Sequence, residues 1–189
     1  MKYQFTWQLS YDLPVGKGRA LNLDGALNSA FGGWTVNSIV YASTGVPIAS
    51  PTAGSWASVS YFNQRPDLTC NPSSGAPHTA AHWFNSDCFS LPSSPFVAGT
   101  APAYLDSVRT MGARDLDLSL YKTFELTERM KLRFEIAGYN VFNKAQFGMP
   151  NVPDIFSVST QQNVKDSFGQ ITNTVNTPRQ FQFGLRFTF

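Results

Sequence analysis

The chain has 189 residues, enough for one ordinary domain, and its formal net charge is only +2. Charged residues make up 14% of the sequence, well below the roughly 25% of a typical soluble domain. The small net charge argues against a nucleic-acid partner, and the lack of any apolar run of about 18 residues excludes a transmembrane helix. We identify no signal peptide, since Met1–Phe5 leads directly into an alternating segment, so an exported protein is expected to extend beyond this chain.

The N-terminal segment predicts two strands joined by a short connection. In residues 3–13 every second side chain is apolar, which gives the strand one apolar and one polar face. Turn-forming residues occupy 14–19, and residues 21–31 can form one or two helical turns before the next strand. That strand, residues 33–44, has a weaker pattern because Ser38 interrupts one face, so its two faces stay unassigned.

Two long segments, residues 45–110 and 144–177, show no regular alternation and are predicted to be loops. Loops longer than about 12–15 residues are uncommon in compact soluble domains. They are normal on the extracellular side of outer-membrane β-barrels, whose other turns are short. Short apolar patches at Trp83-Phe84 and Cys88-Phe89 indicate that the first loop folds on itself.

Between these loops, residues 112–124 and 130–143 predict a hairpin closed by a turn at 125–129. Lys122 falls on the apolar face near one end, where a lysine ammonium can reach the membrane interface. Beyond Gly138 the apolar positions change register, which predicts a β-bulge there.

The polar face of this hairpin carries four charged residues, Asp115, Asp117, Arg133 and Glu135. Pairing across the predicted turn sets Tyr121 opposite Arg133 and Ser119 opposite Glu135. A catalytic carboxylate pair is conceivable. We interpret the face instead as the charged wall of a barrel lumen, to which Arg186 also belongs. No Ser-His-Asp, P-loop or dinucleotide motif accompanies it, so we expect neither enzyme activity nor a cofactor.

The last strand, residues 178–189, has the clearest pattern in the chain. Polar residues separate five apolar ones, which are Phe181, Phe183, Leu185, Phe187 and Phe189. Its length fits the roughly 9–11 residues of a tilted membrane strand better than the roughly 5–6 of a soluble strand. We therefore expect the apolar residues to face lipid.

Short links alternate with long loops along the five predicted strands. In an antiparallel up-and-down sheet, the short links then lie at one end and the loops at the other, as in transmembrane barrels. Aromatic residues gather at the short-link end like an interfacial girdle, namely Tyr11, Trp34, Phe124, Phe134, Phe187 and Phe189. We predict an all-β fold in which residues 1–189 form part of a transmembrane β-barrel with two unpaired edges. The alternative is a soluble β-sandwich binding domain with the apolar face as its core.

The order and spacing of several short segments carry a family resemblance. They are Tyr11-Asp-Leu-Pro-Val-Gly-Lys-Gly-Arg19, Gly33-Trp34, Thr44-Gly-Val-Pro47, Gln64-Arg-Pro-Asp-Leu68, Trp83-Phe84, Arg114-Asp-Leu-Asp-Leu-Ser-Leu-Tyr-Lys122, Asn140-Val-Phe-Asn143, Phe168-Gly-Gln-Ile-Thr172 and Pro178-Arg-Gln-Phe-Gln-Phe183. Together they resemble the C-terminal end of a TonB-dependent outer-membrane receptor of the Oar-like, carboxypeptidase-regulatory-like subgroup abundant in Acidobacteria.

This resemblance implies a place in the outer membrane of a Gram-negative bacterium and a role in importing a siderophore, oligosaccharide or peptide. Such receptors have barrels of about 22 strands with an N-terminal plug and a TonB box, neither of which lies in this chain. The implied partners are the lipid bilayer, the rest of the barrel and its plug, the TonB energy-coupling system, and the barrel-assembly machinery that reads the final Phe. A passive porin or adhesin-like barrel is the alternative.

Cys70 and Cys88, the only cysteines of the chain, both lie in the first long loop. Because the cell exterior is oxidising, we predict that they form a disulfide. His78 and His82 lie between them, which raises a metal site as a weaker hypothesis, but the spacing matches no structural zinc pattern. Two free thiols beside incidental histidines are the third possibility.

Overall fold

The structure of the chain, a computed structural model, describes residues 1–54, 64–157, 162–163 and 167–189. The chain divides into two compact units, which we call the wall unit and the loop unit. The wall unit consists of Tyr3–Ser43, Ala113–Ala145 and Asn176–Phe189, and the loop unit of Met1–Lys2, Thr44–Gly112 and Gln146–Val175. In the described ranges, no helix is long and apolar enough to cross a membrane.

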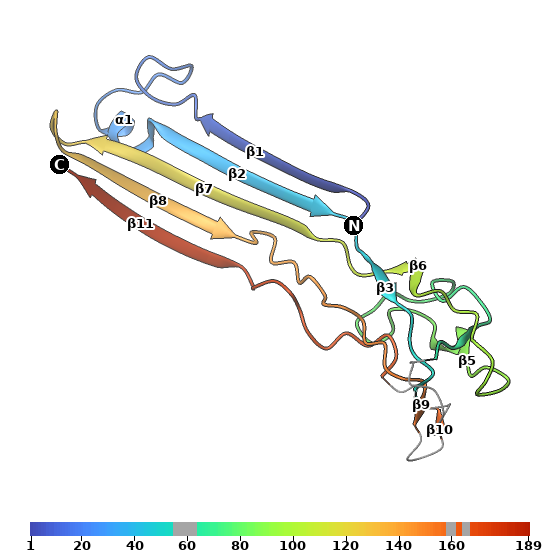
Figure 1. The fold of residues 1–189 in the computed structure, drawn as a ribbon. Coiled ribbons are helices and arrows are strands. Elements are labelled where there is room, and N and C mark those ends of the chain that lie inside the picture. The colour runs from blue at the N-terminus through green and yellow to red at the C-terminus, as the bar shows by residue number, and fades with distance from the viewer. Residues whose placement is uncertain (55–63, 158–161, 164–166) are drawn as a thin grey trace. The chain divides into compact units, whose positions relative to one another are not determined.

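The wall unit is a five-stranded antiparallel sheet in which the spatial order of the strands follows the chain (Figure 1). Its strands are β1 (Gln4–Asp12), β2 (Trp34–Ser43), β7 (Arg114–Glu125), β8 (Lys131–Tyr139) and β11 (Gln180–Thr188). Strands of 9 to 12 residues are close to the roughly 9–11 that a tilted membrane strand needs. The sheet is open, with β1 and β11 as its edges. The predicted fold class is confirmed.

The two ends of this sheet differ in their connections. One end carries the β1–β2 connection with its helix α1 (Gly25–Phe31), the β7–β8 turn and the C-terminus, and we call it the turn end. Both long segments leave from the other end, which we call the loop end. The up-and-down order that the sequence predicts is therefore present.

The faces of the sheet are also divided as the alternation predicts. Residues paired across strands share a face, and Phe183 lies opposite Ile136 on the apolar side. Tyr121 lies opposite Glu135 on the polar side. Phe183 and Leu185 are 69% and 70% exposed, so the apolar face is not the buried core of this unit.

The register assigns the faces of β2, which the sequence leaves open. Val40 pairs with Leu116 on the apolar face, and Ile39 pairs with Asp117 on the polar face. Ser38 lies on the apolar face and is buried. The alternation in the sequence is ambiguous because β2 carries Ser38 on its apolar face and Ile39 on its polar face.

The turn between β7 and β8 lies one residue later than predicted. β7 runs to Glu125, and the N–H groups of Leu126 and Thr127 both donate to the carbonyl of Met130. The turn therefore occupies residues 126–130 instead of 125–129.

This displacement makes the predicted cross-strand pairs of the hairpin wrong. Moving a turn by one residue changes the pairing by two, so Arg133 lies opposite Thr123, and Glu135 lies opposite Tyr121. Ser119 is paired with Ala137. Because the change is even, every side chain keeps its face, and the assignment of polar and apolar sides survives.

The predicted bulge near Gly138 is also wrong. β8 pairs with β11 in unbroken register through Gly138 and Tyr139. The strand ends because Asn140 adopts a left-handed backbone with φ +48°, which asparagine tolerates better than most residues. The ring of Phe181 packs over Gly138, so closely that an added Cβ there would lie 3.0 Å from it.

The loop unit combines the two long segments around one hydrophobic core. Residues 55–63, 158–161 and 164–166 of the predicted loops lie outside the described ranges. The unit contains short strands and a 3-10 helix, namely β3 (Pro47–Ala49), β4 (Asp67–Leu68), η2 (Ser86–Cys88), β5 (Phe89–Ser90), β6 (Tyr104–Arg109), β9 (Phe156–Ser157) and β10 (Gln162–Asn163). The core residues are Ile48, Ala53, Trp83, Phe84, Phe89, Leu105, Val108, Ile155, Phe168 and Ile171. The sequence predicts folding within the first loop, but not this sharing with the second.

Candidate functional site

The polar face of the wall sheet holds its charged residues in specific contacts. The guanidinium of Arg133 lies 3.8 Å from the centre of the Tyr121 ring and 3.3 Å from a carboxylate oxygen of Glu135. Asp117 accepts a 2.9 Å hydrogen bond from the backbone N–H of Asn140. These side chains are half-buried, so they form an ordered polar surface of the kind that lines a barrel lumen.

The remaining charged residues predicted for the lumen fall on the same face. Asp115 accepts a 3.0 Å hydrogen bond from the N–H of Leu116, and Arg186 lies opposite Arg133. Asp117 and Glu135 line a hollow of about 140 Å³ together with Asn37 and Ser119. The face therefore offers both signs of charge and several hydroxyl and amide groups to a polar solute.

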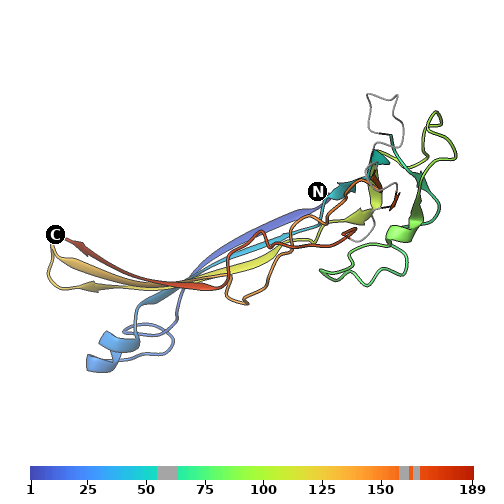
Figure 2. The ribbon, with the colours of Figure 1, turned by 90° about the horizontal axis from the view of Figure 1, so that it is seen from below.

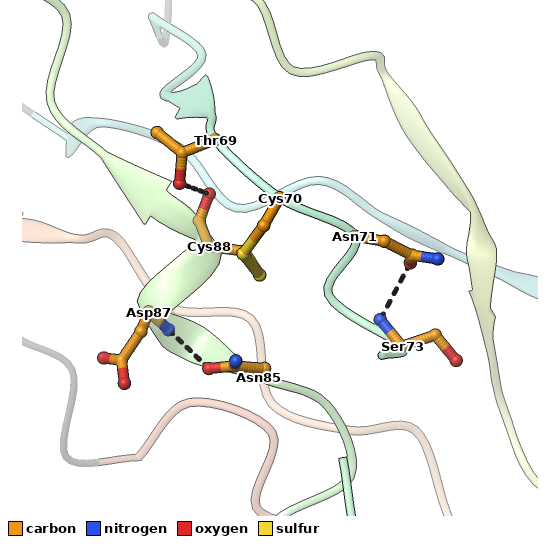
Figure 3. The surroundings of a disulfide bond; sticks show 7 residues. All are labelled: Thr69, Cys70, Asn71, Ser73, Asn85, Asp87 and Cys88. Atoms are coloured by element: carbon orange, nitrogen blue, oxygen red, sulfur yellow. Dashed lines mark hydrogen bonds between the residues drawn. A yellow bond between two sulfur atoms is a disulfide. The ribbon is translucent and has the colours of Figure 1, made fainter. Parts of the chain in front are cut away.

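The structure brings Cys70 and Cys88 together in a disulfide in the loop unit (Figure 3). The bond lies beside the β4–β5 pair, and the Cys88 carbonyl accepts hydrogen bonds from both the N–H and the hydroxyl of Thr69. Asn85 caps η2 by accepting a 2.9 Å bond from the N–H of Asp87. A crosslink closing a loop of this size contributes about 3 kcal/mol to stability.

The two histidines between the cysteines are not brought together with a third ligand. His78 packs edge-on against Trp83, with ring centroids 5.7 Å apart, and His82 closes a small turn with Thr79. In the part of the chain that is described, no group of three or more His, Cys, Asp or Glu side chains is arranged to hold a metal ion.

Backbone hydrogen bonds join the two halves of the loop unit. Trp83 donates to the carbonyl of Gly169 at 3.0 Å, and Ile171 donates to Ala80 at 2.7 Å. Gly169 has a left-handed φ of +68°, and its Cα lies so close that an added Cβ would be 3.3 Å from the Trp83 nitrogen. Phe168 lies in the core next to Phe84, with their ring centroids 6.1 Å apart. The unit therefore presents both loops as one preformed surface.

Several large side chains of the loop unit remain on its surface. Phe96 is 82% exposed, and Tyr104, Met149 and Val175 are also exposed. Aromatic residues held on a folded scaffold are suited to ligand contact, because they provide area at little entropic cost. These residues are the candidates for ligand binding that sequence patterning does not identify, since they follow no periodicity.

The last strand presents its apolar residues outward at an open edge. Phe181, Phe183, Leu185 and Phe187 are exposed on one face, and Phe189 is 91% exposed. The rings of Phe187 and Phe189 lie 5.9 Å apart. β11 has a hydrogen-bonded neighbour on one side only, so these residues lie on the exposed face of an edge strand, and their role as an assembly signal stays a prediction.

The predicted girdle residues lie at the turn end of the sheet. Trp34 and Phe134 flank Lys122 on the apolar face, and their rings meet edge-to-face at 6.2 Å. Lys122 itself is only 6% exposed, and its ammonium donates to the carbonyls of Asn28 and Ser29. The sequence predicts that this lysine reaches the interface, whereas the structure binds it to the end of α1.

Asn140 and Asn143, the two ends of the Asn140-Val-Phe-Asn143 motif, form a junction between β8 and β11. The Asn140 side chain donates to the carbonyls of Lys144 and Thr177 and accepts from the N–H of Lys144. Asn143 accepts from the N–H of Arg179 at 2.9 Å. The pair ends β8 and fixes the start of β11, and both residues have a left-handed backbone. The available signal in the sequence was two asparagines within four positions, since asparagine tolerates this conformation better than most residues.

Comparison with known proteins identifies a family. The family model described as "Outer membrane beta barrel domain" matches residues 1–182. No curated protein and no solved structure matches the chain. The matched region includes the whole of β1, β2, β7 and β8, and it agrees with the open antiparallel sheet and its exposed apolar face. The chain belongs to the outer membrane beta barrel domain family.

Proposed function

We propose that this chain is the C-terminal wall segment of a TonB-dependent receptor, and that the loop unit binds a scarce ligand for import. The observation that carries the proposal is the loop unit itself. Two segments that leave the same end of the sheet share one core, and a disulfide closes a loop within the first of them. Closing hairpins requires far shorter connections, so the added chain is best explained by ligand binding.

The open sheet supports the proposal that further strands complete the barrel. Both β1 and β11 end the sheet with an unpaired edge, and five strands are fewer than the eight of the smallest single-chain barrels. We infer that strands of the same protein pair with both edges. The 189-residue segment alone is expected to aggregate in water, because its edges and its apolar face have no cover.

Energy coupling is the part of the proposal that rests on family resemblance. A plug and a TonB box encoded upstream would support it, and their absence would favour the passive porin. The direct test is uptake of candidate siderophores, oligosaccharides and peptides by cells carrying the full gene, with and without a working TonB system. Uptake that persists unchanged without TonB would establish the porin alternative.

The ligand-binding role of the loop unit has a separate test. Replacing Phe96 and Tyr104 with serine removes exposed aromatic area and leaves the shared core intact. We expect this double variant to lose ligand affinity while the barrel still assembles, as reported by heat-modifiable gel mobility. Phe31→Ser, at an aromatic residue of the wall unit that is 61% exposed against 63% for Tyr104, is the control and should leave affinity unchanged. Unaltered binding by the double variant would contradict the assignment of these residues.

A further inference from the structure

The β1–β2 connection lies on one side of the wall sheet, at the turn end (Figure 2). Two contacts from apolar-face residues fix it there. The indole N–H of Trp34 donates to the Ala30 carbonyl at 3.0 Å, and the ammonium of Lys122 donates to the Asn28 and Ser29 carbonyls at 3.2 and 2.5 Å. In a barrel the apolar face meets lipid, so this connection lies on the lipid side of the wall.

The connection is a compact element organised around Asn28. Its side-chain oxygen accepts from the N–H of Lys17 at 2.9 Å, and its carbonyl accepts from the N–H of Gly32. Gly16 and Gly32 approach so closely that a Cβ on Gly32 would lie 2.9 Å from the Gly16 Cα. Gly33 adds a 3.1 Å bond to the Val15 carbonyl. The connection therefore holds its side chains in defined positions.

The outer surface of the connection is apolar. Leu27 and Phe31 are 59% and 61% exposed and lie at positions i and i+4 of α1, which places them on one face of the helix. Leu21 is equally exposed in the preceding segment. A short amphipathic helix beside a lipid-facing sheet is suited to the boundary between headgroups and acyl chains.

Beside these apolar residues lies a basic cleft of about 450 Å³. Lys17, Arg19 and Lys122 line it, with the backbone and polar groups of Asn28 and Ser29. The single acidic residue in its lining, Glu125, is paired with Lys131 at 3.3 Å. The cleft therefore carries an excess of positive charge.

The three cations of the cleft differ in their partners. Arg19 contacts Asp12 at 3.6 Å and donates to the Leu13 carbonyl, and Lys122 uses two of its three N–H groups on α1. Lys17 enters none of the ion pairs found among the described residues. Lys17 is thus the side chain most available to an incoming anion.

We propose that the β1–β2 connection binds an anionic phospholipid of the inner leaflet of the outer membrane. The phosphodiester occupies the cleft beside Lys17 and Lys122, while Arg19 stays with Asp12 of the polar face, and the acyl chains lie along Leu27, Phe31 and the apolar face. The inner leaflet is the site because the short connections of such barrels lie on the periplasmic side. A phospholipid fits better than an acidic protein because exposed apolar residues border the basic groups, as in membrane-surface helices.

The first test measures lipid retention by the full-length protein in nanodiscs of phosphatidylcholine with added phosphatidylglycerol. Native mass spectrometry after detergent exchange counts bound phosphatidylglycerol. Lys17→Gln should weaken its retention about fivefold, the effect of one basic residue at an anionic surface. Arg129→Gln, in the β7–β8 turn at the same end and outside the lining of the cleft, is the control and should retain the lipid. Equal retention by wild type and Lys17→Gln would overturn the proposal.

The second test locates the helix and does not depend on the strength of lipid binding. The described residues contain no free cysteine, so Leu27→Cys introduces a selective site for a nitroxide label. In power-saturation EPR, molecular oxygen should relax the label at position 27 more strongly than a water-soluble nickel complex does. A label at Glu128→Cys, in the β7–β8 turn, should show the reverse. A label at position 27 that is as water-accessible as the one at position 128 would place the helix in the periplasm and overturn the proposal.

Discussion

The wall unit and the loop unit use aromatic residues in opposite ways. In the wall sheet, Phe183 and Phe187 point outward and are exposed, while the opposite face carries charge. In the loop unit, Phe84 and Phe89 are buried in a core. The difference follows from the solvent, because a membrane strand faces hydrocarbon and gains nothing from hiding its apolar side chains, whereas a unit in water must enclose them. The wall unit thus exposes Phe183 and Phe187, and the loop unit buries Phe84 and Phe89.

The largest expected effect comes from opening the core of the loop unit. Phe89 is fully buried and packs against Phe84 and Phe168. Phe89→Ala should reduce the stability of this unit by about 3–5 kcal/mol and leave the barrel assembled. Proteolysis of the loops in intact cells reports the first effect, and heat-modifiable gel mobility reports the second. Phe96→Ala, at an exposed position of the same unit, is the control and should change neither.

A smaller effect is expected from placing a charge on the lipid face of the wall. Phe183 lies within β11 on the apolar face, and an arginine near the bilayer midplane of a barrel costs about 2–4 kcal/mol. Phe183→Arg should therefore lower barrel stability in urea titrations of the full-length protein. Gln182→Arg, one position away on the lumen face, should be tolerated. If the two variants were equally destabilising, the assignment of faces would be wrong.

The disulfide should stabilise the loop unit without affecting the wall. Cys70→Ser combined with Cys88→Ala removes a crosslink that spans 18 positions and should cost about 3 kcal/mol. Loop proteolysis should accelerate while gel mobility stays unchanged. In the wild type, alkylation without reductant followed by mass spectrometry should leave both cysteines unmodified. Alkylation of both thiols in assembled, non-reduced protein would contradict the bond.

The contrast between the units also explains which features the sequence predicts. Alternation with period two indicates a strand that has one apolar and one polar face. The wall strands and their faces can therefore be predicted from patterns such as the one in residues 180–188. The turn at 126–130 is missed by one residue because Glu125 fits a turn or a strand end equally well. Pairing depends on that position, which is why the opposite partners of Arg133 and Glu135 are mispredicted.

The loop unit could be predicted only in part, because its core has no period. The patch at Trp83-Phe84 indicates local folding, but its partners Phe168 and Ile171 lie in the other loop. Nothing in a single sequence specifies such a long-range contact. The fixing of Lys122 by α1 is missed for the same reason, since its acceptors at Asn28 and Ser29 are more than 90 positions away. Asn140 could have been recognised, because asparagine favours the left-handed turn that ends β8.

The smallest effect on stability is expected at Phe189, where the effect on assembly should be large. This residue is 91% exposed and touches the ring of Phe187 at the turn end of β11. A charge near the membrane interface costs only about 0–1 kcal/mol in a folded barrel, so Phe189→Asp should barely alter unfolding of protein refolded in detergent.

If the final strand is read by the assembly machinery, the same variant should accumulate unfolded in cells, as shown by loss of heat-modifiable mobility in membrane fractions. Thr188→Asp, which changes the neighbouring polar position, is the matched control and should assemble. This pair of measurements separates a signal from a structural contact: normal assembly of Phe189→Asp would remove the signal, whereas a matching loss of stability in detergent would show that the residue acts through packing alone.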